Sequence, residues 1–166
     1  MSNRNLLAAE VLVTAEVPAW EERAIVDAFR DLDVAARTRM VPIRRGAEQL
    51  QWLVLATLPL QALLSGLGSA AAQDVTQSLK RLVGRVLGAK RATARVAQVL
   101  VLQDVATRLQ VVLEADLPAE AYQELITLDL SAFGQGPVHY DRHRGEWRSE
   151  LDEWQQQCRA EGAPPA

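Results

Sequence analysis

The first part of the chain shows two different spacings of apolar residues. In residues 10–17, EVLVTAEV, apolar and polar side chains alternate, which predicts a β-strand. Beyond Pro18, apolar residues recur every three or four positions over residues 19–32, which predicts an amphipathic helix. A second strand is predicted over residues 38–44, where Pro42 favours a strand end or a sheet edge. The apolar stripe of the helix contains Trp20, Ala24, Ile25, Ala28, Phe29 and Leu32, and its polar face contains Glu21, Glu22, Asp27 and Asp31.

The segment from Gln51 to Gln73 contains no charged residue, which allows three interpretations. Its densest apolar run, residues 52–64, is shorter than the about 20 residues that a bilayer-spanning helix needs, and Pro59 interrupts it. We therefore favour a long apolar helical crossover packed on a sheet over a partner-binding surface or a membrane-inserting segment. A helix that is apolar all round needs cover on more than one side. The residues that would form an apolar interaction surface are Trp52, Leu55, Leu58, Leu60, Leu63, Leu64 and Leu67.

The second half of the chain continues with clear helix and strand patterns. Residues 74–88 have one apolar face and one basic face, which predicts an amphipathic helix. Two β-rich runs, residues 95–103 and 107–115, are separated by the short turn DVA, which favours a hairpin. A further helix is predicted over residues 118–130, because a proline opens it and a glutamate lies in its first turn. VHYD and GEWRS, within residues 138–149, predict a short second hairpin.

This order of elements predicts an α+β fold. A mixed sheet of about five strands, with helices mainly on one face, accommodates both a long crossover and a local hairpin. Hydrophobic residues make up 49% of the chain, which is typical of a globular protein and not of a disordered one. We find no repeat and no linker, so residues 1–157 are predicted to form a single domain, followed by a disordered tail at residues 158–166.

Charge and cysteine content disfavour some functions and locations. The net charge of −3 argues against a general nucleic-acid binder, because affinity for phosphate backbones comes from clustered lysine and arginine. The single cysteine, Cys158, cannot form an internal disulfide, which fits a reducing compartment. The amino-terminal apolar patch soon meets Glu10 and Glu16, unlike the uninterrupted apolar region of a signal peptide. A cytoplasmic location is therefore predicted.

Basic residues concentrate in one part of the chain. Positive charge near the carboxyl end of a helix is favourable, so the simplest interpretation is a solvated helix face. The alternative is a basic surface for an acidic partner, and the acidic first helix would be its complement in self-association. No aromatic residue interleaves these cations, which disfavours single-stranded nucleic acid. The basic surface contains Lys80, Arg81, Arg85, Lys90, Arg91 and Arg95.

Candidate chemistry is sparse. His139, Asp141 and His143 would share one face of a strand and could meet a metal ion, but flanking arginines and Gly145 favour a polar hairpin. Cys158 has no nearby base that would make it a nucleophile. The serine-hydrolase, phosphate-loop and dinucleotide motifs are absent from the sequence. We therefore predict no catalytic residue, no cofactor, no bound metal and no small-molecule substrate.

Residues 10–114 contain, in order, VLVTAEVP, MVPI, the charge-free LQWLVLATLPLQALLSGLGSAAA and the basic LKRLVGRVLG. In this order of elements the chain resembles the effector-associated constant component family of bacterial conflict systems. The resemblance implies a small non-catalytic companion, encoded beside an effector and acting through protein contacts. It defines no functional residue that can be transferred to this chain.

These observations together predict a cytoplasmic, non-enzymatic interaction module that binds a protein partner or associates with itself. Its contact surface would be the apolar or the basic set of residues given above. One alternative is a membrane-acting protein that uses Trp52 to Ala72. Another is a small metal-dependent enzyme that uses His139, Asp141 and His143.

Overall fold

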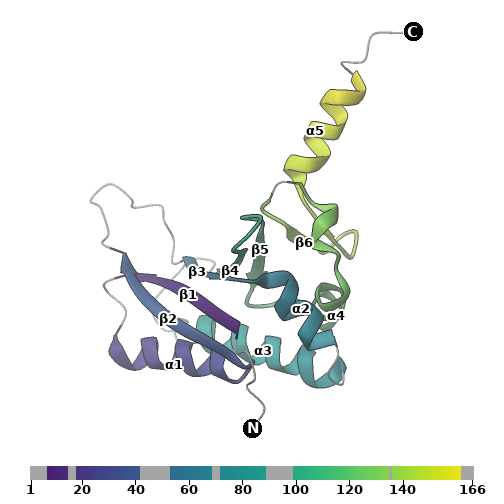
Figure 1. The fold of residues 1–166 in the computed structure, drawn as a ribbon. Coiled ribbons are helices and arrows are strands. Elements are labelled where there is room, and N and C mark those ends of the chain that lie inside the picture. Colours follow the sequence, from purple (N-terminus) through teal and green to yellow (C-terminus); the bar gives the residue numbers. More distant parts are fainter. Residues whose placement is uncertain are drawn as a thin grey trace.

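A computed structural model describes residues 7–14, 18–41, 53–68, 72–88, 99–134 and 136–161. Within these ranges the chain forms an α+β fold (Figure 1). The elements in chain order are β1 (Leu7–Thr14), α1 (Ala19–Arg30), β2 (Val34–Val41), β3 (Leu53–Leu58), α2 (Leu60–Gly68), α3 (Ala72–Gly88), β4 (Val99–Asp104), β5 (Gln110–Glu114), α4 (Ala119–Thr127), a 3₁₀ turn (Leu130–Ala132), β6 (His139–Asp141), β7 (Glu146–Arg148) and α5 (Glu150–Glu161).

The main sheet has five strands in the order β2-β1-β3-β4-β5. The pairs β1–β2 and β3–β4 are parallel, whereas β1–β3 and β4–β5 are antiparallel. Each parallel pair requires a crossover, which α1 supplies for the first pair and α2 with α3 for the second. Helices α1 to α4 lie on one side of the sheet (Figure 1). The predicted α+β class and five-stranded mixed sheet are therefore confirmed.

The core lies between the sheet and these four helices. Because successive strand residues point to opposite faces, alternate apolar residues of every strand meet the helix layer. The predicted stripe is confirmed for Ile25, Ala28 and Phe29 of α1 and for Leu32 just after it, which are all buried. The buried residues of the main sheet in the same cluster are Ala9, Val11, Val13, Val34, Val54, Ala56, Leu58, Leu100, Leu102, Val111 and Leu113.

The charge-free segment does not form the long apolar helix that its composition suggested. Its first part is β3, in the middle of the sheet between β1 and β4, and Pro59 separates this strand from the short helix α2. A central strand has neighbours on both sides, so a run such as LVLATL is as typical of a strand as of a buried helix. Within the described residues, no helix is long and apolar enough to cross a membrane.

This placement changes the predicted apolar interaction surface. Leu58, Leu60, Leu63 and Leu64 are almost completely buried and belong to the core cluster, so they are not available to a partner. Leu55 points to the opposite face of the sheet and is partly exposed. Trp52 and the side chain of Leu67 lie outside the described residues.

Two further expectations are corrected at the edges of elements. In α1, Trp20 is 62% exposed, whereas Glu21 is buried, the reverse of the predicted arrangement. The strand expected over residues 38–44 begins earlier, at Val34, and pairs along its whole length with β1. The Thr38 hydroxyl donates a hydrogen bond to Glu22, which ties the first turn of α1 to this edge strand.

The carboxyl-terminal part adds a hairpin and a projecting helix. The predicted hairpin is confirmed as β6 and β7, and Val138 extends it to β5 through backbone hydrogen bonds of 2.9 and 2.8 Å with Val112 and Gln110. The Trp147 indole donates to the Ala121 carbonyl of α4 at 2.9 Å, which fixes the hairpin to the core. Where a disordered tail was expected from residue 158, helix α5 continues to residue 161.

Candidate protein-interaction surface

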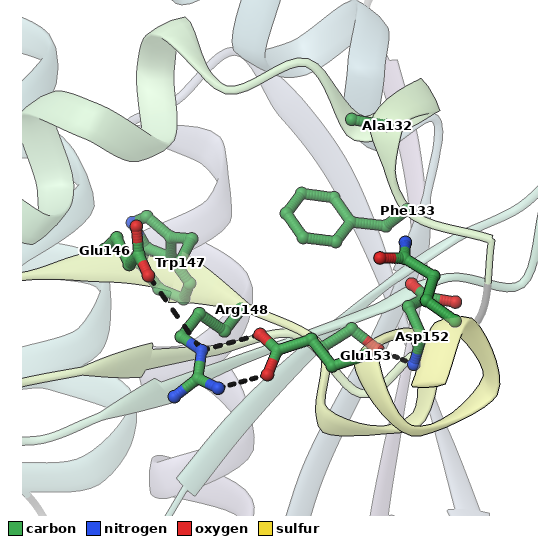
Figure 2. A pocket seen from close by; sticks show the side chains of 9 residues that line it. Ala132, Phe133, Glu146, Trp147, Arg148, Asp152 and Glu153 are labelled. Atoms are coloured by element: carbon green, nitrogen blue, oxygen red, sulfur yellow. Dashed lines mark hydrogen bonds and ion pairs between the residues drawn. The ribbon is translucent and has the colours of Figure 1, made fainter. Parts of the chain in front are cut away.

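The base of α5 is fixed by an ion-pair network at the end of β7. Arg148 donates from Nε to Oε1 of Glu153 at 2.6 Å and from Nη2 to Oε2, a bidentate pair (Figure 2). Arg148 also donates from Nη1 to Oδ2 of Asp141. The hydrogen bonds from Arg148 lower the pKa of both carboxyl groups, and their reciprocal effect raises the pKa of Arg148. Bidentate arginine–carboxylate pairs fix orientation as well as distance, so the first turn of α5 has a defined position.

A second set of contacts holds the same turn from another side. The Gly134 amide donates to Oδ2 of Asp152 at 3.1 Å, linking α5 to the segment after the 3₁₀ turn. Ser149, which is buried, immediately precedes α5, and its carbonyl accepts from the Glu153 amide at 3.2 Å. These contacts attach the amino-terminal turn of the helix to the body, with Asp152 and Glu153 on the attached side.

A shallow pocket of about 230 Å³ lies beside this attachment. Figure 2 shows the Phe133 ring and the side chains of Arg148, Asp152 and Glu153 around it. The guanidinium group of Arg148 already binds two carboxylates, so it is not available for an anionic ligand. The pocket is thus best explained as part of the α5 attachment, and it does not indicate a substrate site.

The outward face of α5 is apolar and exposed. Leu151 is 45% exposed, Trp154 is 62% exposed, and Cys158 is exposed. The spacing of these residues places them on one face of a helix, opposite Asp152 and Glu153. Figure 1 shows α5 extending away from the body. We call Leu151, Trp154 and Cys158 the outer stripe of α5. An apolar stripe held toward solvent is a feature of interaction surfaces.

Glu153→Gln is expected to loosen α5 without unfolding the core. The substitution removes the charge from the bidentate pair with Arg148, while the core cluster contains no residue of α5. Amide hydrogen exchange within residues 150–161 should become faster, and exchange in β3 and β4 should stay the same. Glu150→Gln is the matched control, because the Glu150 side chain is 79% exposed and lies 3.6 Å from His139. Equal exchange rates in the unmodified chain and in both variants would contradict the conclusion that Arg148 fixes the first turn of α5.

The sheet has a second face, opposite the helix layer. In the strand register, Leu12 lies beside Leu55, Leu55 beside Val101, and Val101 beside Val112, which forms an apolar row across four strands. Val101 is buried and the other three side chains are partly exposed. A polar row runs next to it, containing Glu10, Thr57, Gln103 and Gln110.

Two arginines of β2 border this open face of the sheet. Arg37 lies beside Glu10 in the register and Arg39 beside Leu12, and both are exposed. Arg39 forms an exposed ion pair with Glu10 at 3.5 Å. Exposed ion pairs of this kind contribute little to stability, so these cations remain available for long-range attraction of acidic groups.

The predicted basic surface is only partly described. Lys80, Arg81 and Arg85 are exposed on α3, whereas Lys90, Arg91 and Arg95 lie outside the described residues. Arg85 donates to Asp31 at 2.6 Å, so the acidic end of α1 is a complement of α3 within one chain. This contact accounts for part of the charge pattern without a second molecule.

The proposed metal ligands are used in other contacts. Oδ1 of Asp141 accepts from the amides of His143 and Arg144 at 2.9 and 3.2 Å, and Oδ2 accepts from Arg148. His139 Nε2 lies 3.6 Å from Glu150. In the part of the chain that the structure describes, no group of three or more histidine, cysteine or acidic side chains could hold a metal ion. Asp141 stabilises the hairpin turn in this arrangement.

No model of a known family, no curated protein and no solved structure matches this chain. The function therefore has to be inferred from the surfaces themselves.

Proposed function

We propose that this chain is a non-catalytic protein-interaction module that binds its partner through the outer stripe of α5. The observation that carries the proposal is the combination of a firmly attached helix base with an exposed apolar face. A free helix of 12 residues would be marginal in water, whereas α5 is fixed by Arg148 and Asp152 and so presents its stripe in a defined orientation. Preorganisation of this kind lowers the entropic cost of binding.

The chemistry of α5 defines the surface that it would bind. Trp154 and Leu151 require an apolar groove or face, and tryptophan is enriched among residues that dominate binding energy. The helix has four acidic residues and one basic residue, a difference of −3, and three of the acids lie in its first turn. The rim of the receiving surface should therefore be basic.

This proposal agrees with the role implied by the family resemblance, a companion or adaptor of an effector in a bacterial conflict system. Such a role needs a docking surface and no reactive site. The proposal replaces the buried leucines of α2 with α5 as the contact surface, because α5 is the described helix whose apolar stripe is exposed.

A photo-crosslinking amino acid at position 154 is expected to give a defined protein adduct, which mass spectrometry would identify. The identified protein, purified, should bind the Leu151→Ala/Trp154→Ala variant about tenfold or more weakly than the unmodified chain. Trp20→Ala is the matched control, because Trp20 is also 62% exposed but lies on α1. Equal binding of all three proteins would show that α5 is not the contact surface.

A further inference from the structure

We infer that α5 binds a second copy of this chain, and that the open face of the partner sheet receives it. The inference rests on the proposed function, because it names the occupant that the outer stripe of α5 would contact. It starts from two incompletely covered apolar surfaces on one molecule, the outer stripe and the row of Leu12, Leu55, Val101 and Val112.

The open face lacks the helix layer that covers the other face. Helices α1 to α4 all pack on the side of Val11, Val54 and Leu100, and no described helix covers the apolar row. A sheet that buries apolar residues on both faces commonly packs between two layers. Helix α5 is a short amphipathic helix with an exposed apolar stripe, so it can form the missing second layer on the open face.

The dimensions of the two surfaces agree. The apolar row spans three gaps between neighbouring strands, which is about 14 Å. The 12 residues of α5 form a helix about 18 Å long. One α5 can therefore lie across the whole row and place Leu151 and Trp154 on it.

Charge complementarity favours the same pairing. Arg37 and Arg39 project at the β2 margin of the open face, where Glu10 is the acidic neighbour. Three of the four acids of α5 lie in its first turn; Asp152 and Glu153 are held on the attached side, and Glu150 is 79% exposed. A helix that lies across the sheet with its amino-terminal end toward β2 would place the Glu150 carboxylate near these arginines.

The attachment of α5 favours contact between molecules. Arg148 and Gly134 hold the side of α5 that carries Glu153 and Asp152, so the outer stripe is directed away from its own body. Figure 1 shows that α5 projects on the side of the sheet away from the helix layer. Two copies related by a two-fold axis can therefore each place α5 on the other. Such a dimer contains the helix–sheet contact twice. The doubled contact helps to bury the surface area of about 1,200–2,000 Å² that is typical of a stable interface.

Sedimentation velocity of the full chain across a dilution series is the first test. We expect a concentration-dependent dimer whose dissociation constant rises about tenfold or more in Leu151→Ala/Trp154→Ala. Arg37→Glu/Arg39→Glu should also weaken the dimer, and more strongly at low salt. The matched controls are Trp20→Ala and Arg81→Glu, which change an exposed tryptophan and an exposed arginine on the helix layer. Circular dichroism checks that each variant is folded.

The outcomes separate this inference from the proposed function. Cys158 is the only cysteine of the chain, so the rate of its reaction with a maleimide reports on the outer stripe. In the inferred dimer this rate falls as protein concentration rises. If the chain is a monomer and Cys158 reacts rapidly with the maleimide, self-association is ruled out and the proposed function stands. If the chain is a monomer and Cys158 reacts slowly, both the self-association and the proposed function are ruled out. A dimer weakened by the α5 variant but not by the arginine variant overturns the sheet face as the receiving surface.

Discussion

Asp104→Ala is expected to lower the free energy of unfolding by about 2–4 kcal/mol, a large effect for one polar residue. Asp104 is buried at the end of β4, and its Oδ1 accepts from the Leu60 amide at 2.9 Å. Its Oδ2 accepts from the amides of Ala106 and Thr107 at 3.1 and 2.9 Å and from the Thr107 hydroxyl at 3.0 Å. Alanine would leave these donors without their acceptor. Urea denaturation measures the difference.

The titration of Asp104 gives an independent readout of the same contacts. Burial raises the pKa of this carboxyl group, but the hydrogen bonds from Thr107, Leu60 and Ala106 outweigh it, so the net pKa lies below 3.8. A lowered pKa in the folded state stabilises the fold above the unfolded-state value, and the stabilisation is lost as pH falls through the folded-state value. Asp104→Asn keeps one acceptor oxygen and does not titrate. It should therefore lose less stability than the unmodified chain when the pH falls below about 4.

An exposed aspartate provides the control for Asp104. Asp129 accepts from the amide and hydroxyl of Ser131 in a similar local turn, but it lies at the surface. Asp129→Ala should change stability much less, because water can replace the lost acceptor. A similar loss in both variants would show that the contact between Asp104 and Leu60 is not important for the fold.

Leu64→Ala is expected to cost about 2–5 kcal/mol of stability, the range observed when a fully buried leucine is truncated. Leu64 has no exposed surface and lies on α2, a helix that contacts both β4 and α4. The substitution removes apolar contacts and leaves a cavity that neighbouring helices fill only in part. Urea denaturation at equal protein concentrations is the measurement.

Leu151→Ala is the matched control for Leu64, because it removes the same atoms from a half-exposed position on α5. Measured on protein diluted until it is monomeric, its effect on unfolding should be within about 0.5 kcal/mol. If instead Leu64→Ala left stability unchanged, the leucines of the charge-free segment would not be core residues. The other interpretation of the charge-free segment, a partner-binding surface, would then be favoured.

The sequence was sufficient for the parts of the fold that depend on local periodicity. The strand at β1, the helix at α1 and both hairpins follow from alternation, a three-to-four spacing and turn residues. The segment containing β3 was assigned wrongly for a physical reason. A six-residue run in which Thr57 is the one polar position is too short to reveal its period, and its neighbours β1 and β4 decide that Leu53–Leu58 is a strand.

The candidate surface was harder to predict than the fold. Leu151, Trp154 and Cys158 have helical spacing, but glutamines and acids surround them, and the sequence pattern predicts no helix there. Their exposure depends on Arg148 and Gly134, which orient α5 and are not its helical neighbours. Likewise, the contact of Asp104 with Leu60 joins positions 44 residues apart and has no local signal.

Within the described residues, the core cluster ends at Trp147, before α5 begins. Mutations in α5 beyond its first turn are therefore expected to leave this packing unchanged. The identity of residues 154 to 161 can change with little effect on the amount of folded protein. Natural variation, or deliberate redesign, could alter what this helix recognises while the sheet and its four covering helices stay the same.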